Sequence, residues 1–441
     1  MNIGMYLGLI ILFSVFIFEI CFSIYCIRLK SYEDMKRNII RIIAFLAFIL
    51  ITLVSVIEWS FRWYAFYTWL LILAVMGTVS LVNQKKVSSM AFNKRRVIIK
   101  STAVFGAFFL TLTPVLIFPQ YSQLPVTGGY NVATKVYTYT DYNRIEIFSD
   151  SEEHRKLTVQ YWYPENAYHT FPLIIFSHGA FGIKTSNLSL YNELASNGYV
   201  VCSIDHTYHS FFTTDTDGKT TFINSNYMKE VIREDVHTSK TKSFEYYQEW
   251  MGIRTGDINF VVDYILTEAV NNDADKVYSL VNKEKIGVMG HSLGGSAALG
   301  IGRVRNDIRA VMALESPYLC DITAVENDQF VWNEEKYRIP VLNIYSNSSW
   351  SYLAEWPQYY KNAEMLLDMD VDVYNVYLQG AGHLSLTDLA LSSPILTRIL
   401  DGQNAKIDAR YSLITINQVA LEFFNYYLKG YDTINIEKFI D

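Results

Sequence analysis

Four long apolar runs occupy the first part of the chain, at about residues 3–27, 40–58, 63–83 and 97–118. Each is close to the roughly 20 residues that an α-helix needs to cross the hydrocarbon core of a bilayer. The first run is too long for a signal peptide, and no small-residue cleavage site follows it. We therefore expect residues 1–120 to form a four-span transmembrane region.

Basic residues are concentrated in two of the three loops between these runs. The first and third loops are rich in lysine and arginine, whereas the second offers Arg62 alone. Because basic loops remain on the cytoplasmic side, the pattern predicts that the first and third loops lie inside. The N-terminus and everything beyond Pro119 are then extracytoplasmic. The predicted location is the cell membrane, as a multi-pass protein whose partner is the bilayer.

A carboxylate, Glu19, interrupts the first apolar run. Intramembrane carboxylates often mark a function. The alternative, which we favour, is a protonated glutamate that faces another helix or lies near the membrane interface.

The pattern changes after residue 120. Residues 121–132 contain Pro125 and two glycines and are expected to form a linker. Runs of β-branched and aromatic residues then predict three strands that open a large sheet, at 135–141, 144–150 and 156–164.

Short, continuously apolar runs follow, separated by helical patterns. They predict strands buried on both faces, at 172–179, 199–206, 286–289, 308–315, 339–346 and 371–378. Helices are expected at about 250–267, from residue 293, and at 413–430. This alternation predicts an α/β domain over residues 133–441, with a mostly parallel sheet flanked by helices.

One long polar and aromatic segment does not fit this alternation. It covers about residues 207–250 and precedes the strand at 286–289. A long insert at this point of an α/β domain is expected to form a cap or lid over a binding site. A flexible surface loop is the alternative, particularly for residues 215–221.

Composition agrees with a membrane protein. Apolar residues make up 51% of the chain and aromatic residues 15%, more than in an average soluble domain. The net charge of −7 offers no basic footprint for nucleic acid, and we expect no nucleic-acid partner. The four cysteines form no framework and are expected to be free thiols.

The sequence Gly290-His291-Ser292-Leu293-Gly294 lies between a predicted strand and a predicted helix. A G-x-S-x-G turn in this context presents a serine hydroxyl at the top of a sheet as a nucleophile. The helix that follows favours negative charge at its first amides. We predict that Ser292 is a catalytic nucleophile; the alternative is a turn that serves packing alone.

A serine nucleophile needs a base, and His383 is the one histidine after the turn. It follows the last predicted strand, in the Gly-containing loop 378–386. Loops that follow parallel strands open on the same edge of a sheet, so this loop can reach Ser292. We predict that His383 accepts the serine proton; the alternative is a surface histidine in a flexible loop.

The base needs a carboxylate that orients its ring. Glu315 ends the strand at 308–315 and is the preferred acid, with Asp321 as second choice. Glu355 lies too far beyond the next strand to fit well. The alternative for Glu315 is a strand-end residue that faces solvent.

An oxyanion hole requires two N–H donors. The amide of Leu293 is one candidate, and the loop after residues 172–179 should supply the other, for which we choose Ala180. His178 is expected to shape that loop. His206 and His209 lack a carboxylate partner at ligand spacing, so we predict no metal site.

These residues resemble a known family. The soluble part is similar to the α/β-hydrolase fold and, within it, to platelet-activating factor acetylhydrolases and their bacterial relatives, which are grouped with dienelactone-hydrolase-like esterases. The similarity covers about residues 130–430 and is carried by QYWYPEN (160–166), IIFSHGAFG (174–182), IDHTYHS (204–210), IRTGDINFVVDYIL (253–266) and GHSLGG (290–295).

The resemblance implies Ser292 as nucleophile, His383 as base and Glu315 at the acid position, where family members more often carry aspartate. It implies Ala180 and Leu293 as oxyanion donors, and no metal or organic cofactor. The implied activity is hydrolysis of carboxylic esters, including short acyl chains on phospholipid-like substrates. An acyltransferase with the same triad and a catalytically inactive membrane sensor or scaffold are the alternatives.

Overall fold

The computed structural model describes residues 3–30, 34–82, 92–149, 151–271, 275–366, 372–402 and 406–436. The chain divides into two compact units. The first comprises Met1–Gln123 and Leu391–Leu396, and the second comprises Leu124–Ala390 and Thr397–Asp441. Each unit has its own hydrophobic core.

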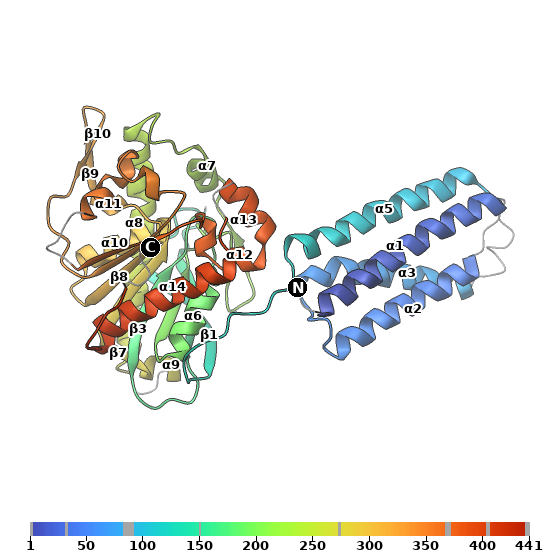
Figure 1. The fold of residues 1–441 in the computed structure, drawn as a ribbon, viewed down its shortest axis with the longest axis horizontal. Coiled ribbons are helices and arrows are strands. Elements are labelled where there is room, and N and C mark those ends of the chain that lie inside the picture. Colours follow the sequence, from blue (N-terminus) through green and yellow to red (C-terminus); the bar gives the residue numbers. More distant parts are fainter. Residues whose placement is uncertain are drawn as a thin grey trace. The chain divides into compact units, whose positions relative to one another are not determined.

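The first unit is a bundle of long helices that lie side by side (Figure 1). Its described helices are α1 (Ile3–Leu29), α2 (Asp34–Leu53), α3 (Tyr64–Val82) and α5 (Lys94–Ile117), with a short 3₁₀ turn, Phe61–Trp63, before α3. Large aromatic residues fill the interior, including Phe48, Trp63 and Phe66. Leu46 and Leu50 are among many apolar side chains exposed on the outside, as expected for helices surrounded by lipid.

Three of the described helices are long and apolar enough to cross a membrane: Gly4–Leu29, Phe61–Val82 and Lys94–Ile117. The predicted second span, residues 40–58, differs from the structure. Helix α2 begins at Asp34 and ends at Leu53, so it includes the basic residues Lys36, Arg37 and Arg41. In this 20-residue helix the three basic residues fall within any stretch of 18 residues, whereas the basic residues of α5 lie at its N-terminal end and leave a long apolar stretch after them.

Glu19 faces these basic residues. Its carboxylate accepts hydrogen bonds at 2.9 Å from Arg37 Nε and from an outer guanidinium nitrogen of Arg41. All three residues are buried. Glu19 thus faces another helix, as expected, but its two cationic partners require a carboxylate rather than the protonated acid that we expected.

The second unit is built on a mixed sheet. Its strands are β1 (Val132–Ile145), β2 (His154–Pro164), β3 (Phe171–Ser177), β4 (Val200–Asp205), β7 (Val281–His291), β8 (Ile308–Leu314), β11 (Val341–Ser346) and β12 (Val373–Leu378), in the order β1-β2-β4-β3-β7-β8-β11-β12. The pairs β1–β2 and β2–β4 are antiparallel, and the pairs from β4 to β12 are parallel. The predicted α/β class with a mostly parallel sheet is confirmed.

Helices cover both faces of this sheet (Figure 1). They include α6 (Leu188–Ser196), α8 (Lys240–Glu268), α10 (Leu293–Val304) and α14 (Ala409–Phe424). A side chain on Gly287 would meet Phe424 of α14, whereas the next residue, Val288, belongs to the core cluster that includes Ile258 of α8. Because successive strand residues face opposite sides, α14 and α8 lie on opposite faces.

The segment predicted as a cap is ordered. It forms a hairpin of β5 (Phe212–Thr214) and β6 (Thr220–Phe222), followed by α7 (Ser225–Arg233) and the first turns of α8. The amide of Phe211 donates to the carbonyl of Gly182 at 3.0 Å. The hairpin is therefore attached to the loop that follows β3.

Candidate active site

Ser292 lies in a sharp turn between β7 and α10. Its backbone is left-handed, with φ 54° and ψ −127°, and its amide donates to the Leu314 carbonyl at 2.8 Å. A side chain on Gly290 would collide with the backbone of Gly294, and one on Gly294 would collide with the Ser177 carbonyl. These positions require glycine, because the strand, turn and helix approach so closely.

The loop after β3 lies against this turn. A Cβ atom on Gly179 would be 3.2 Å from the Cβ of Ser292 and 2.7 Å from His291 Nδ1. Within the described part of the chain, the Ala180 amide donates to no acceptor. Leu293 is the first residue of α10, so its amide has no intrahelical acceptor either. Both amides are thus free to bind an oxyanion.

His383 lies beside the residue that precedes Ser292. The ring centroids of His291 and His383 are 4.5 Å apart, and His291 Nε2 is 3.0 Å from the His383 carbonyl oxygen. Burial lowers the pKa of His383, while the carboxylate of Asp401 opposes that shift. Between the described side chains of His383 and Ser292 there is no hydrogen bond, so the predicted base lies near the turn without a hydrogen bond to the hydroxyl.

Glu315 follows β8 and has a left-handed backbone, with φ 51°. Its buried carboxylate accepts a hydrogen bond from the Ser346 amide at 2.7 Å. The other carboxylate oxygen has no partner in the described part of the chain. Burial raises the pKa of Glu315 to about 7. The predicted acid is therefore at the same sheet edge as the predicted nucleophile, but it is not hydrogen-bonded to His383.

The second-choice acid, Asp321, lies elsewhere. Its carboxylate forms an ion pair with Arg303, with Arg303 Nε at 2.9 Å from one oxygen. Arg303 lies near the C-terminal end of α10, whereas Ser292 precedes its N-terminal end. Asp321 therefore neutralises an arginine at the opposite end of the helix from Ser292.

Another carboxylate, Asp401, holds the loop that carries His383. It accepts hydrogen bonds from the Leu384 amide at 2.9 Å and from the Ser385 amide at 3.2 Å. Asp401 ends helix α13 (Pro394–Asp401). Asp401 was not predicted from the sequence because it follows His383 in the chain and does not end a strand.

Another serine and histidine, together with an aspartate, form a hydrogen-bonded chain next to the loop after β3. Ser177 Oγ is 2.7 Å from His206 Nε2, and His206 Nδ1 is 2.9 Å from Asp257 Oδ2. Asp257 also accepts two hydrogen bonds at 2.6 Å from Arg155. All four residues are buried, and burial lowers the pKa of His206 to about 4. The Ser177 hydroxyl thus has triad-like partners but no access for a substrate.

His209, the second histidine of the same segment, is also enclosed. Its ring stacks on Tyr227 with centroids 3.7 Å apart. Neither ring nitrogen has a partner in the described part of the chain. His206 and His209 therefore take part in polar and aromatic packing. The sequence feature that could have indicated this buried network is a pair of charged residues, Arg254 and Asp257. Both lie on the apolar face of a helix that was predicted to pack in the core.

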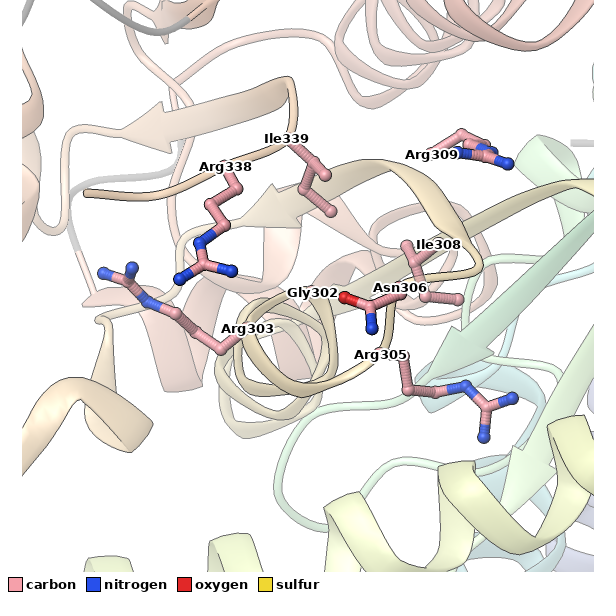
Figure 2. Close-up of a pocket in the computed structure, with 8 residues that line it drawn as sticks. All are labelled: Gly302, Arg303, Arg305, Asn306, Ile308, Arg309, Arg338 and Ile339. Atoms are coloured by element: carbon pink, nitrogen blue, oxygen red, sulfur yellow. The ribbon is translucent and has the colours of Figure 1, made fainter. Parts of the chain in front are cut away.

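A cavity of about 250 Å³ lies at the other end of the sheet (Figure 2). It is lined by Gly302, Arg303, Arg305, Asn306, Ile308, Arg309, Arg338 and Ile339. These residues come from the C-terminal end of α10, the start of β8 and the segment just before β11, away from Ser292. The side chain of Arg309 points away from those of Arg303 and Arg338 in Figure 2, and Arg303 and Arg305 form ion pairs with aspartates. The cavity is separate from the candidate active site.

Comparison with known proteins agrees with this fold. Residues 155–437 match the family described as platelet-activating factor acetylhydrolase, isoform II. Platelet-activating factor acetylhydrolase from Canis lupus familiaris is 22% identical over 284 residues, which are 58% of this chain and 57% of the relative. The protein of the same name from Cavia porcellus is 22% identical over 277 residues, 60% of each chain. The chain thus spans about three fifths of the length of these relatives.

A solved structure extends the comparison to the fold. Ferulic acid esterase from Streptomyces cinnamoneus superposes with a TM-score of 0.52 at 19% identity, covering 70% of this chain and 93% of the esterase. The expected α/β-hydrolase fold and the family resemblance read from the sequence are both confirmed.

Proposed function

This chain belongs to the platelet-activating factor acetylhydrolase isoform II family, and from that premise we propose that it is a membrane-anchored serine hydrolase of carboxylic esters. The observation that carries the proposal is the turn at Ser292. Ser292 has a positive backbone φ and lies in a turn between a strand and a helix, with two free amides beside it. Ester hydrolysis requires such an exposed nucleophile and two N–H donors for the oxyanion.

The proposed reaction has two steps. Ser292 Oγ attacks the ester carbonyl carbon while His383 accepts the hydroxyl proton, and the amides of Ala180 and Leu293 bind the oxyanion. His383 then gives the proton to the departing alcohol, which leaves an acyl-enzyme. Water attacks the acyl group, His383 accepts its proton and returns it to Ser292 Oγ, and the carboxylic acid departs.

For this reaction, His383 must form hydrogen bonds to both Ser292 and Glu315. The His383 ring has no hydrogen bond to Ser292 or Glu315 in the described structure, and its neighbour His291 holds the loop at 3.0 Å. Catalytic hydrogen bonds are often long without substrate and form in the complex. Glu315, with one unpartnered carboxylate oxygen, is our proposed partner for His383 Nδ1.

The proposed substrates are short acyl esters of phospholipid-like molecules. Two observations support this class: the family match over residues 155–437, and the three helices that are apolar enough to cross a membrane. An enzyme held at a bilayer meets amphipathic esters at high local concentration. The hairpin that is attached to Gly182 is our proposed cap, within residues 207–250.

For the membrane region we propose residues 1–120 as four spans, 121–132 as linker and 133–441 as an extracytoplasmic catalytic domain. Helix α2 would be the second of these four spans. Its length of 20 residues suits a bilayer, and Glu19 offsets part of the charge of Arg37 and Arg41. Protease treatment of intact cells tests the orientation: cleavage within residues 130–441 is expected, and complete protection would contradict it.

Turnover of p-nitrophenyl acetate and butyrate tests the activity. Wild-type protein is expected to hydrolyse both, and Ser292→Ala to be inactive. Ser279→Ala is a matched control, because Ser279 is exposed and precedes the opposite end of β7; it should keep wild-type rates. Equal rates for Ser292→Ala and wild type would refute the proposal.

The same assay separates the two rival functions. An acyltransferase would pass the acyl group to an added alcohol or amine rather than to water, and product analysis distinguishes these outcomes. An inactive sensor or scaffold would show no turnover. The unpaired carboxylate oxygen of Glu315 favours this second rival, as does the missing hydrogen bond between His383 and Ser292 in the described structure.

A further inference from the structure

The carbonyl groups of the loop after β3 point toward helix α8, where Arg254 receives them. The Arg254 guanidinium is fully buried. Its Nη1 donates to the His178 carbonyl at 2.5 Å, and its Nη2 lies 3.4 Å from the Gly179 carbonyl. The ring of His178 donates to the same Gly179 carbonyl, with Nδ1 at 2.7 Å. Together with the Gly182 amide, whose nitrogen is 3.2 Å from the same oxygen, three donors thus hold the carbonyl that precedes Ala180.

These contacts determine where the Ala180 amide points. In a trans peptide the C=O and the next N–H are antiparallel. With the Gly179 carbonyl directed at Arg254, the Ala180 N–H is directed away from α8. Gly179 itself lies against Ser292, because an added Cβ would be 3.2 Å from the Cβ of Ser292. A flip of this peptide would remove the donor and leave a carbonyl oxygen in its place.

A role in stabilising the fold does not by itself explain why Arg254 is buried here. Its hydrogen-bond acceptors among the described residues are two carbonyls and, at 3.4 Å, the Tyr227 hydroxyl. The Nε atom has no partner there. The nearby carboxylate of Asp257 is already bound by Arg155 and His206. Burying a cation without its own carboxylate destabilises the fold, whereas a cation bonded to a carbonyl polarises the peptide and strengthens its N–H as a donor.

We propose that Arg254 is a positioning residue for the oxyanion hole, which fixes the peptides of residues 178–180 so that the Ala180 amide faces the ester oxygen. This inference rests on the proposed hydrolase function. It assigns a role to a residue that does not touch the substrate, and it links α8 to the chemistry at Ser292.

Kinetics of Arg254→Met and Arg254→Lys test the role. Methionine keeps most of the side-chain volume without charge, and lysine keeps the charge without the two-pronged geometry. We expect kcat for p-nitrophenyl butyrate to fall roughly 10- to 100-fold. This decrease is equal to or smaller than the decrease caused by removing one oxyanion donor. KM should change little. Lys242→Met, on the exposed face of the same helix, should match wild type.

A transition-state analogue separates positioning from general damage. A trifluoromethyl ketone forms an oxyanion adduct on the serine, so its inhibition constant should rise in both variants by the same factor as kcat/KM falls. Thermal unfolding of each variant is measured alongside. Folded variants with wild-type kcat, or with weakened substrate binding and unchanged inhibitor affinity, would overturn the inference.

His178 supplies a second route to the same carbonyl if the Arg254 variants fail to fold. His178→Asn keeps an N–H donor near Gly179 and should retain kcat, whereas His178→Leu should lose it; equal kcat for the two would overturn the inference. An inactive wild type would overturn the proposed function and this inference with it. An active wild type with unaltered Arg254 variants would overturn the inference alone.

Discussion

The rings of His291 and His383 lie 4.5 Å apart between centroids, and His291 Nε2 is 3.0 Å from the His383 carbonyl oxygen. His291 directly precedes Ser292, so this contact joins the loop of the proposed base to the turn of the proposed nucleophile. A neutral ring with its proton on Nε2 donates this hydrogen bond. We therefore expect His291 to position the proposed base, His383.

Replacing His291 tests that contact. His291→Leu removes the donor to the His383 carbonyl, and we expect kcat for p-nitrophenyl butyrate to fall roughly fivefold or more, the worth of one hydrogen bond. His291→Gln can still donate and should retain most activity. Steady-state kinetics of the three proteins provide the measurement. If His291→Leu keeps the wild-type rate, the contact has no role in positioning the base.

The pH dependence of kcat/KM reports the protonation of His383. The ring must be neutral to accept a proton, and burial lowers its pKa from the ordinary value while Asp401 raises it. The ionisation of His383 alone should therefore limit activity only below pH 6.5. The Glu315 carboxyl, with a pKa of about 7, must also be ionised in the proposed triad, so activity should already decline as the pH drops below about 7. Asp401→Asn removes the opposing charge and should shift the acid limb to lower pH. A shift to higher pH would contradict this assignment.

Glu315 links activity to stability. Folding raises its pKa from 4.5 to about 7, so the folded state favours the protonated acid and the free energy of unfolding decreases as pH rises from about 4.5 to 7. Glu315→Gln should therefore stabilise the protein at pH 8, by up to about 3 kcal/mol, with little change at pH 4.5. Its kcat should fall roughly 10²- to 10⁴-fold.

Denaturant unfolding at the two pH values and ester kinetics measure these effects. Glu326→Gln is the matched control, because Glu326 is exposed on β9 (Ile322–Glu326). It should change neither quantity. A Glu315→Gln variant with wild-type kcat would remove Glu315 from the triad.

His209 offers a test of the buried network. Its ring stacks on Tyr227, both ring nitrogens lack partners in the described part of the chain, and burial lowers its pKa well below 6.5. His209→Phe keeps the stacked ring and removes two unsatisfied nitrogens, so we expect stabilisation by about 1 kcal/mol at pH 7. The gain should grow at pH 5, because a histidine with a lowered pKa loses stability as pH falls below 6.5.

Urea unfolding of His209→Phe at pH 7 and pH 5 gives the answer. His237→Phe, at an exposed histidine, serves as control and should show no such pH-dependent gain. A loss of stability at both pH values would mean that the ring nitrogens make contacts that the described structure lacks.

Sequence periodicity predicted the central sheet well. The continuous apolar runs at 172–179, 199–206 and 308–315 correspond closely to β3, β4 and β8, because strands buried on both faces are apolar throughout. At the sheet edge the pattern was less reliable. The run at 144–150 was expected to form a strand of its own, but β1 continues to Ile145 and the chain then turns.

Long-range polar contacts could not be predicted from the hydrophobic pattern of the sequence. Residue type and spacing indicated Ser292, but nothing local to Arg254 shows that its partners are carbonyls of a loop some 75 residues earlier. Likewise Glu19 meets Arg37 and Arg41 only once α1 and α2 pack together. Such partners depend on tertiary structure, whereas hydrophobic period depends on local geometry.

The identity of the nucleophile is tested most directly by labelling the wild-type protein with a fluorophosphonate and mapping the modified peptide by mass spectrometry. Ser177 is the internal comparison, because it has the closer histidine, 2.7 Å from its hydroxyl, but is buried. We expect the label on Ser292 and none on Ser177, with labelling abolished in Ser292→Ala. A label on Ser177, or no label on folded protein, would contradict the proposed function.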